Sequence, residues 1–523
     1  MPEQSKRRRG RKRTAAATLL LAYAALAMER ADAALLPAVY REIGAALQAS
    51  PTALGSIVLS RSVVQAACYP LAAYLAARHD RLTVIALGAF LWAAATLLIG
   101  LSTTFAQAGD PCPCTFHSCS LAAVRPCPGP ELWSLRKSND AILQMAVTAA
   151  LNGVGLALQI PAIFAFVADS VDGTNRGMAF GWLMVASKAG TVGGTTLGLL
   201  MAPTSFFGVP GWRLAFLLLA AVGAVVGLSI RAFAAASKAP VRAPKPVRQE
   251  LQDFAREAKA VLRIPSFQVI VAQGLTGSFP WSALSFTAMW LELVGFSHGE
   301  TAALMTLFKV ATSLGGLFGG KMGDVLAGRL KNSGRIILAQ ISAGSAIPLA
   351  GVLLLALPSE PATFAHHGAA LFVMGFMASW NTSATNSPIL AEIVPPRSRT
   401  SVYALDRTFE AVLASFAPPV VGMLAEHLYG YKLVRSAAGG AGHAASVETD
   451  RHNATSLARA LYTAIAIPMA LCCLVYSFLY CTYPRDRDLA RAETARDGGG
   501  ARPSGEGSDT DDEGEEEREL LPL

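Results

Sequence analysis

The sequence has little charge for its length. Only 15% of its 523 residues are Asp, Glu, Lys or Arg, whereas a soluble protein has roughly 25%. Charged residues gather in short clusters between apolar runs of about 20 residues, a length that suits a bilayer-spanning helix. Because backbone groups in a bilayer must satisfy one another, each run is predicted to be a helix. The pattern is typical of an all-α membrane protein.

Several functional motifs are also absent. The sequence has no Walker motif, which argues against ATP-driven transport, and no catalytic triad or metal motif. We therefore expect no enzymatic activity, no cofactor and no metal site. The net charge is +8, but no basic, aromatic-rich domain lies outside the apolar runs. No nucleic-acid partner is expected.

The apolar runs predict twelve membrane spans. The basic N-terminal stretch KRRRGRKR and the following apolar run resemble a signal peptide, with Ala25 and Ala27 near a cleavage site. However, the apolar run resumes after three charges, which favours a cytoplasmic polybasic end. With this topology the cytoplasmic loops hold most of the Lys and Arg, so both termini are predicted to be cytoplasmic. The spans begin near Ala15, Ala53, Leu82, Ala141, Met178, Trp212, Phe267, Ala303, Ile336, Gly368, Tyr403 and Ala460.

An internal repeat divides the chain into two halves. The loop after span four reads ADSVDGTNRG and the loop after span ten reads AEIVPPRSRT. Related loops, AYLAARHDR and GKMGDVLAGR, follow spans two and eight. Such a duplication is typical of transporters. The predicted regions are a basic N-terminus (1–14), an N-terminal six-helix half (15–236), a cytoplasmic linker (237–265), a C-terminal six-helix half (266–483) and a disordered acidic tail (484–523).

Comparison of the halves exposes an insertion at 108–140 in the first half. It contains four cysteines and one histidine whose spacing fits known zinc patterns poorly. Disulfides on an oxidising side of the membrane are an alternative. We favour a disordered insertion or an artefact of the gene model. The residues concerned are Cys112, Cys114, Cys119, Cys127 and His117.

The chain resembles the major facilitator superfamily over nearly its whole length. The loop GKMGD, with the later Gly334–Arg335, matches the signature between helices two and three of each half. The stretches MERAD, ACYPLAAYLAARH, LNGVGLAL, RGMAFGW and GSFPWSALSF resemble the spinster-like branch, especially its plant and algal members. This resemblance implies twelve transmembrane helices in two pseudo-symmetric halves, a monomer, and secondary active transport by alternating access. It also implies a lysolipid or sphingoid substrate, with organic anions and proton coupling left open.

Span one carries three ionisable residues near its middle, Glu29, Arg30 and Asp32. A charge at this depth costs about 2.5–3.5 kcal/mol. One interpretation is an internal ion pair that lets the helix insert; the favoured one is that the residues line the transport pathway. Glu29 and Asp32 share one helix face. The resemblance implies a functional acidic–Arg pair at Glu29–Arg30.

Further polar residues in other spans are candidates for substrate binding or coupling. Asp406 and Glu410 lie four apart on span eleven and share a face. The candidates are Lys188, Lys309, Asn381, Asp406, Arg407 and Glu410. Glycines in spans five and eight, including Gly190 and Gly315, allow close helix contact. The resemblance implies that these two helices meet between the halves.

Loop charges at the cytoplasmic edge resemble the gate of the family, which closes the inward side. The first-half loop has Ala77 where the family has an acidic residue, so the loop of Asp324 is predicted to dominate. Span four has Ala149 where relatives carry an Arg, which argues against proton coupling or supports a sensor. The predicted gate residues are Arg78, Arg81, Asp169, Arg176, Asp324, Glu392 and Arg399.

Short motifs near the C-terminus predict modification and sorting. Asn453 lies in an Asn-x-Thr sequence on the lumenal side, where a glycan can be attached. Glu516, Leu520 and Leu521 match an acidic dileucine signal, which favours a vacuolar or endosomal membrane over the plasma membrane. The expected partners are a small-molecule or lipid substrate, membrane lipids and protons. A sensor without flux and a passive lipid scramblase remain the alternatives.

Overall fold

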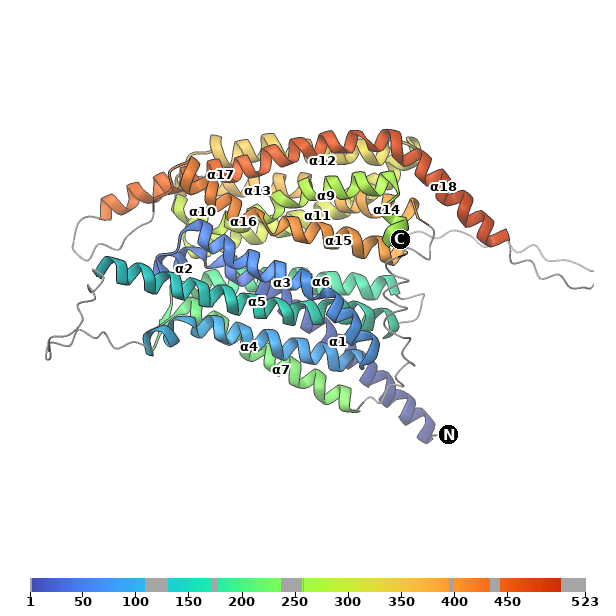
Figure 1. Ribbon diagram of the computed structural model, residues 1–523, viewed down its shortest axis with the longest axis horizontal. Helices are drawn as coiled ribbons and strands as arrows, with labels where there is room; N and C mark the ends of the chain where they lie inside the picture. Colours follow the sequence, from blue (N-terminus) through green and yellow to red (C-terminus); the bar gives the residue numbers. More distant parts are fainter. Residues whose placement is uncertain are drawn as a thin grey trace, which may run out of the picture.

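The chain forms a helical bundle, shown as a computed structural model in Figure 1. A short hairpin is the one sheet in the described part of the chain. Its strands β1 (Ser205–Phe206) and β2 (Val209–Pro210) are antiparallel. Phe207 and Gly208 between them have φ of 50° and 77°, as tight two-residue hairpins require. The structure describes residues 2–108, 130–170, 176–236, 256, 258–394, 399–432 and 443–499.

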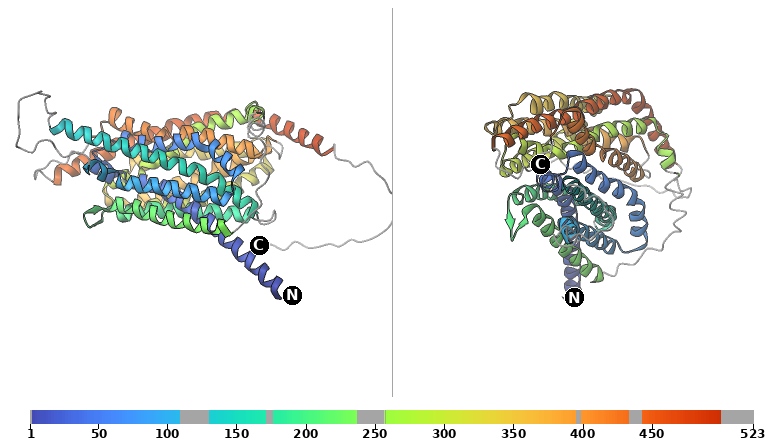
Figure 2. Two further views of the ribbon diagram at one scale, coloured as in Figure 1. Left: turned by 60° about the horizontal axis from the view of Figure 1, so that its bottom comes forward. Right: turned by 60° about the vertical axis from the view of Figure 1, so that its left-hand side comes forward.

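The helices form two layers that follow the sequence order. Figure 1 shows the helices from α1 to α7 in one layer and those from α9 to α17 in the other, and the end-on view in Figure 2 shows the same division. This agrees with the two halves predicted from the repeat. The N-terminal layer consists of α1 (Pro2–Ala38), α2 (Tyr40–Leu47), α3 (Pro51–Arg78), α4 (Arg81–Ala108), α5 (Pro130–Ser170), α6 (Arg176–Met201) and α7 (Gly211–Ala236).

The helices of the C-terminal layer are more often interrupted. One break lies at two prolines: α15 ends at Ala414, and α16 begins at Ala417, directly before Pro418 and Pro419. A proline removes a helical hydrogen bond and clashes with the preceding turn, so this break follows from the sequence. The layer consists of α9 (Pro265–Ala283), η1 (Leu284–Phe286), α10 (Thr287–Val294), α11 (His298–Arg329), α12 (Gly334–Gly351), η2 (Val352–Ala356), η3 (Pro361–Thr363), α13 (Phe364–Ala378), η4 (Thr382–Asn386), α14 (Ser387–Glu392), α15 (Arg399–Ala414), α16 (Ala417–Met423), η6 (Leu424–Leu428), α17 (His443–Ser477) and α18 (Leu479–Gly499).

Seven helices of the described chain are long and apolar enough to cross a membrane. An eighth candidate is α2 with α3, which are bent by 115° at their junction. Each of the twelve predicted spans begins inside a helix, and four of them, on α1, α6, α9 and α13, are not among these candidates. The all-α membrane fold is therefore confirmed. The prediction of twelve spans is compatible with the helices, although fewer than twelve are long and apolar enough by themselves to cross a membrane.

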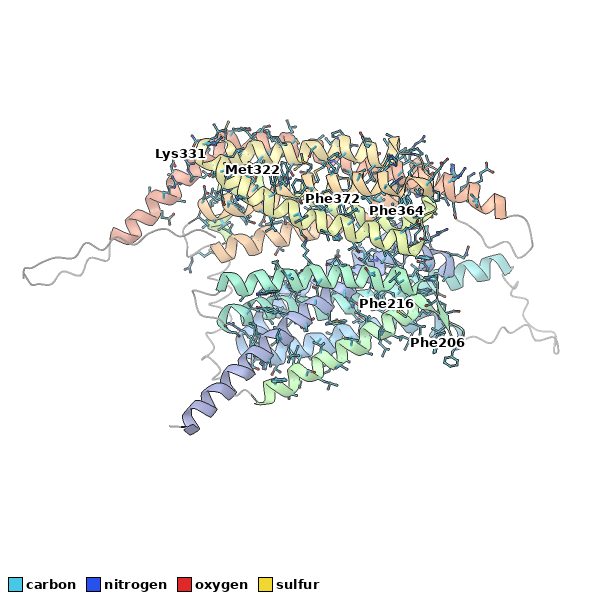
Figure 3. The ribbon with its side chains drawn as sticks, turned by 180° about the vertical axis from the view of Figure 1, so that it is seen from behind. Phe206, Phe216, Met322, Lys331, Phe364 and Phe372 are labelled. Atoms are coloured by element: carbon cyan, nitrogen blue, oxygen red, sulfur yellow. The ribbon has the colours of Figure 1, made fainter. Side chains whose placement is uncertain are left out.

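The two ends of the bundle differ in what they carry. The start of α1 and the end of α18 lie at one end, which we call the proximal end (Figure 1). Lys331 marks the proximal end in Figure 3, whereas Phe206 and Phe364 lie near the opposite, distal end. Outward-facing apolar side chains such as Leu317 are exposed, as expected of a surface that contacts lipid. The predicted linker and insertion lie largely outside the described residues. The tail was predicted to be disordered from residue 484, but α18 continues to Gly499 and buries Asp486 and Arg487, so this prediction is wrong for residues 484–499.

Candidate functional site

Glu29 and Arg30 form an ion pair in the middle of α1. The Glu29 Oε2 and Arg30 Nε atoms are 3.0 Å apart, although their alignment does not make a hydrogen bond. Glu29 is 2% exposed, whereas the Arg30 side chain is 40% exposed. Glu29 therefore lies in the packed interior of the N-terminal half, whereas the Arg30 side chain extends into a more open region.

Asp32 is placed differently from Glu29. It is 3% exposed and lies inside the N-terminal half. Its Oδ1 accepts a 2.7 Å hydrogen bond from Thr96 Oγ1 on α4, and its Oδ2 accepts a 2.9 Å bond from Asn152 Nδ2 on α5. Asn152 also donates to Thr96. The structure thus holds Asp32 in a closed polar network between α1, α4 and α5, within electrostatic range of Glu29.

Arg61 on α3 was missed by the sequence analysis. It acts electrostatically on Glu29, Asp32 and Tyr40. The neighbouring helix comes close because Gly153 has no side chain: a Cβ there would meet the Arg61 carbonyl. The signal was present in IVLSRSVV, where a cation interrupts an apolar run, as in span one. Arg61 supplies a positive charge to the carboxylates, and Ala149 on the neighbouring helix α5 is fully buried.

Two lysines of different halves act on each other. Lys188 on α6 is exposed, and Lys309 on α11 is half-buried. Lys188 interacts electrostatically with both Lys309 and Arg30. Neither lysine forms an ion pair with another described residue. Three positive groups therefore converge where the halves meet, and repulsion among them favours an anionic group nearby.

The polar residues of the C-terminal half gather mainly inside that half. Asp406 on α15 is buried, and the Glu410 side chain packs against α9 at Gly274. Asn381 is half-buried and its Oδ1 lacks a hydrogen-bond partner. The side chain of Arg407 lies outside the described residues.

A second polar network crosses the C-terminal half. Asn386 in η4 donates to Gln273 on α9 and accepts from Tyr476 on α17, at 2.9 and 2.8 Å. The Gln273 amide also donates to Cys472. Gln273 and Tyr476 were not singled out from the sequence, because an isolated polar residue in a span does not reveal its partners.

The proximal end carries a cluster centred on Arg335. Its Nη2 lies 3.0 Å from Asp324 Oδ1, its Nη1 donates to the Ala384 carbonyl, and its Nε lies 3.6 Å from Glu392 Oε1. Tyr483 also donates to Glu392. Burial raises the pKa of Tyr483 to about 12, so this hydroxyl remains a donor at neutral pH. Two predicted gate carboxylates, Asp324 and Glu392, thus share one arginine within the same half.

The structure describes little of the surroundings of the other predicted gate residues. Arg81 is half-buried and has an interaction partner. The side chains of Arg78, Asp169, Arg176 and Arg399 lie outside the described residues, as do Glu516, Leu520 and Leu521.

Asn453 does not have the surroundings that the glycosylation prediction requires. Its side chain is fully buried, and its amide donates to the Lys432 carbonyl at 2.8 Å. The Lys432 N–H donates back to Asn453 Oδ1. A glycan on this nitrogen would break this pair of hydrogen bonds, so the folded structure is incompatible with glycosylation of Asn453.

Polar contacts join the two halves at the distal end. Arg41 at the start of α2 donates to the Glu292 carbonyl at 3.1 Å and to Asp450 Oδ2 at 2.9 Å. The Thr52 N–H at the start of α3 donates to Glu426 Oε1 at 2.6 Å. A carboxylate at a helix N-terminus is favourable because the helix dipole is positive there. Close backbone packing between Gly55 and Pro418 accompanies these contacts.

Comparison with known proteins identifies the family. The family model of the Major Facilitator Superfamily matches residues 15–418. The chain belongs to this superfamily. It is therefore a multi-pass membrane protein of a transporter family rather than an enzyme, as predicted.

Individual members of the superfamily are only distantly similar. An MFS-type efflux pump from Mycolicibacterium smegmatis is 25% identical over 366 residues, which cover 68% of this chain and 76% of the pump. A bacterial homologue of the human lysosomal transporter Spinster, in an inward-facing and unoccupied conformation, has a TM-score of 0.71 at 18% identity. That alignment covers 91% of this chain and 98% of the homologue. The predicted resemblance to the spinster-like branch is confirmed at the level of the fold.

Other solved transporters share the fold at lower similarity. A D-xylose–proton symporter has a TM-score of 0.55 at 15% identity, covering 85% of this chain and 96% of the symporter. A nucleoside transporter has a TM-score of 0.59 at 12% identity, covering 88% and 99%. These solutes differ chemically, so the substrate of this superfamily member must be argued from its own site.

Proposed function

We propose that the chain is a secondary active transporter that moves a small organic or lipid-like solute carrying an anionic group. It works by alternating access and is coupled to protons. The observation that carries this proposal is the Glu29–Arg30 pair, which links a buried carboxylate to an open region beside Lys188. A charge placed so deep in a span is costly, which favours a functional role.

The groups around this pair support both parts of the proposal. Arg30, Lys188 and Lys309 present positive charge from both halves, which suits a phosphate or carboxylate group of the solute. Glu29 is an ionisable group next to this charge, so its protonation changes the local field that the solute meets. Ala149 carries no charge, but Arg61 supplies a positive charge that acts on Glu29. This supports proton coupling in spite of the alanine at position 149.

The distal contacts support alternating access. They close one end of the bundle by joining α2 and α3 to the C-terminal half. Opening that end requires breaking them, and forming new contacts at the proximal end would compensate. We propose that the proximal end faces the cytoplasm, because the basic N-terminal stretch lies there, and that the membrane is vacuolar or endosomal.

Reconstituted protein tests the proposal. Proteoliposomes receive a mixture of lysophosphatidylcholine, lysophosphatidylethanolamine, sphingosine and small organic anions, with and without a pH gradient, and mass spectrometry measures what crosses. We expect gradient-dependent accumulation of at least one compound, reduced at least tenfold by Glu29→Gln. Glu448→Gln, an exposed acidic residue at the distal end, serves as the control and should transport normally.

The same experiment separates the alternatives. Binding of a compound without flux would establish a sensor. Transfer of lipid without a gradient and without dependence on Glu29 would establish a scramblase. Either result would overturn the proposal.

A further inference from the structure

Three ionisable side chains from both halves meet at the distal end. Glu42 lies on α2 of the N-terminal half, whereas Glu292 on α10 and His298 at the start of α11 belong to the C-terminal half. The His298 Nδ1 atom is 2.7 Å from Glu292 Oε1 and 3.8 Å from Glu42 Oε1. One ligand atom of each residue lies within 4.8 Å of the others.

Glu292 is incompletely satisfied in this position. The residue is 2% exposed, and its Oε2 atom is buried without a hydrogen-bond partner. Oε2 of Glu42 is also buried and unpartnered. A buried carboxylate oxygen without a partner is unfavourable, so both atoms favour an additional positive ligand.

The neighbouring arginine does not provide that ligand. Arg41 directs one nitrogen to the backbone carbonyl of Glu292 and the other to Asp450. Its charge is therefore balanced by Asp450. Arg41 therefore offsets the two carboxylates only partly. A proton on His298, which lies 2.7 Å from Glu292, would offset one of them, and this proton must leave when a metal binds the ring.

We propose that Glu42, Glu292 and His298 bind a divalent cation of the Zn²⁺ class that bridges the two halves. Carboxylate oxygen and imidazole nitrogen are both accepted zinc ligands, with bonds of about 2.0–2.2 Å. Tetrahedral bonds of that length place ligand atoms about 3.3 Å apart. The observed separations of 2.7 and 3.8 Å lie on either side of this value, so small side-chain rotations form the site. Water completes the coordination.

The bridging ion holds the distal end closed, because its ligands separate when the halves move apart. This effect rests on the proposed alternating access, whereas ion binding itself does not. Protons compete for the same ligands, so binding weakens as the pH falls.

Calorimetry on the full chain tests binding. The protein carries no affinity tag, its thiols are blocked because cysteines also bind zinc, and it is treated with a chelator before titration with ZnCl₂. We expect one site per chain that is weakened at least tenfold in His298→Ala and, independently, in Glu42→Gln. Glu448→Gln is the matched control, because it removes an exposed acidic residue at the same end outside the cluster and its contacts; its affinity should stay within threefold.

Melting of each variant without metal shows whether it is folded, and a folded variant is compared with the wild type. Absence of a zinc site in the wild type, or an unchanged site in both folded cluster variants, would overturn the proposal. A second measurement addresses the closing effect: zinc should slow modification of a cysteine placed at Thr52 by a thiol reagent, but not in Glu42→Gln, because the Thr52 hydroxyl is buried where the residue lies against Gly422 of the other half. Zinc binding without this protection would overturn the closing effect alone, and would leave binding intact.

Discussion

At the residue scale, the structure gives different partners to two carboxylates that lie on one face of α1. The cost of charge in lipid identified Glu29 and Asp32, and helix periodicity placed them on one face. Periodicity cannot show that Thr96 on α4 and Asn152 on α5, in predicted spans three and four, approach Asp32. For the same reason the Glu42 cluster was not predicted, since its members come from three separate elements.

Asn152 gives a test of the Asp32 network. Asn152→Ala removes one of the two donors to a buried carboxylate, so we expect the free energy of unfolding to fall by about 1–3 kcal/mol. Gln159 lies on the same helix and is equally buried, but its amide atoms have no partner. Gln159→Met should therefore leave the unfolding free energy unchanged or raise it. Denaturant unfolding in detergent measures both; equal losses would show that Asn152 contributes only by packing.

At the element scale, proline and glycine positions explain much of the helix geometry. The break before Pro418 follows from the sequence, because a proline disrupts the preceding turn. The helices of spans five and eight, α6 and α11, are in contact between the halves, as expected. Their glycines also serve contacts within each half: Gly190 lies against Ala27 of α1, and Gly315 lies against Phe376 of α13. A glycine pattern shows that a helix can be approached closely, but not by which neighbour.

Gly190 and Gly193 form a matched pair on α6. A Cβ at Gly190 would collide with the Ala27 carbonyl, two residues before Glu29, whereas a Cβ at Gly193 has no neighbour within 4 Å. Gly190→Ala should separate α6 from α1 and lower the unfolding free energy by about 1–3 kcal/mol. Gly193→Ala should be neutral or stabilise by up to about 1 kcal/mol, because alanine favours the helix. If the two variants melt alike, the close α1–α6 contact is wrong.

At the scale of the whole molecule, the sequence was sufficient for the fold class and for the division into halves. Apolar run length and the repeated loops determine both, because lipid restricts a spanning chain to helices. It was not sufficient for the conformation. Which end is closed depends on a few contacts between distant residues, such as Thr52 and Glu426, whose energies are small compared with the packing of either half.

The Arg335 cluster tests the predicted gate. The Asp324 side chain is 75% exposed, and such ion pairs contribute little individually. Asp324→Asn should therefore shift the ratio of proximal-open to proximal-closed molecules toward the open state by about fivefold at most. Asp488→Asn, which removes another exposed acidic residue at the same end, should change nothing. Reactivity of a cysteine placed at Ser383 toward a charged reagent reports the ratio, and identical values in the two variants would contradict a gating role for Asp324.

Alternating access coupled to Glu29 is the central claim, and distances across both ends test it most directly. Spin labels at Ala46 and Arg451 span the distal end, and labels at His79 and Lys331 span the proximal end, with the eight native cysteines replaced. Pulsed electron paramagnetic resonance measures both pairs at mildly acidic and neutral pH. We predict that one distance lengthens while the other shortens, and that Glu29→Gln abolishes the response. Distances that do not change with pH, or that respond equally in Glu29→Gln, would contradict the account.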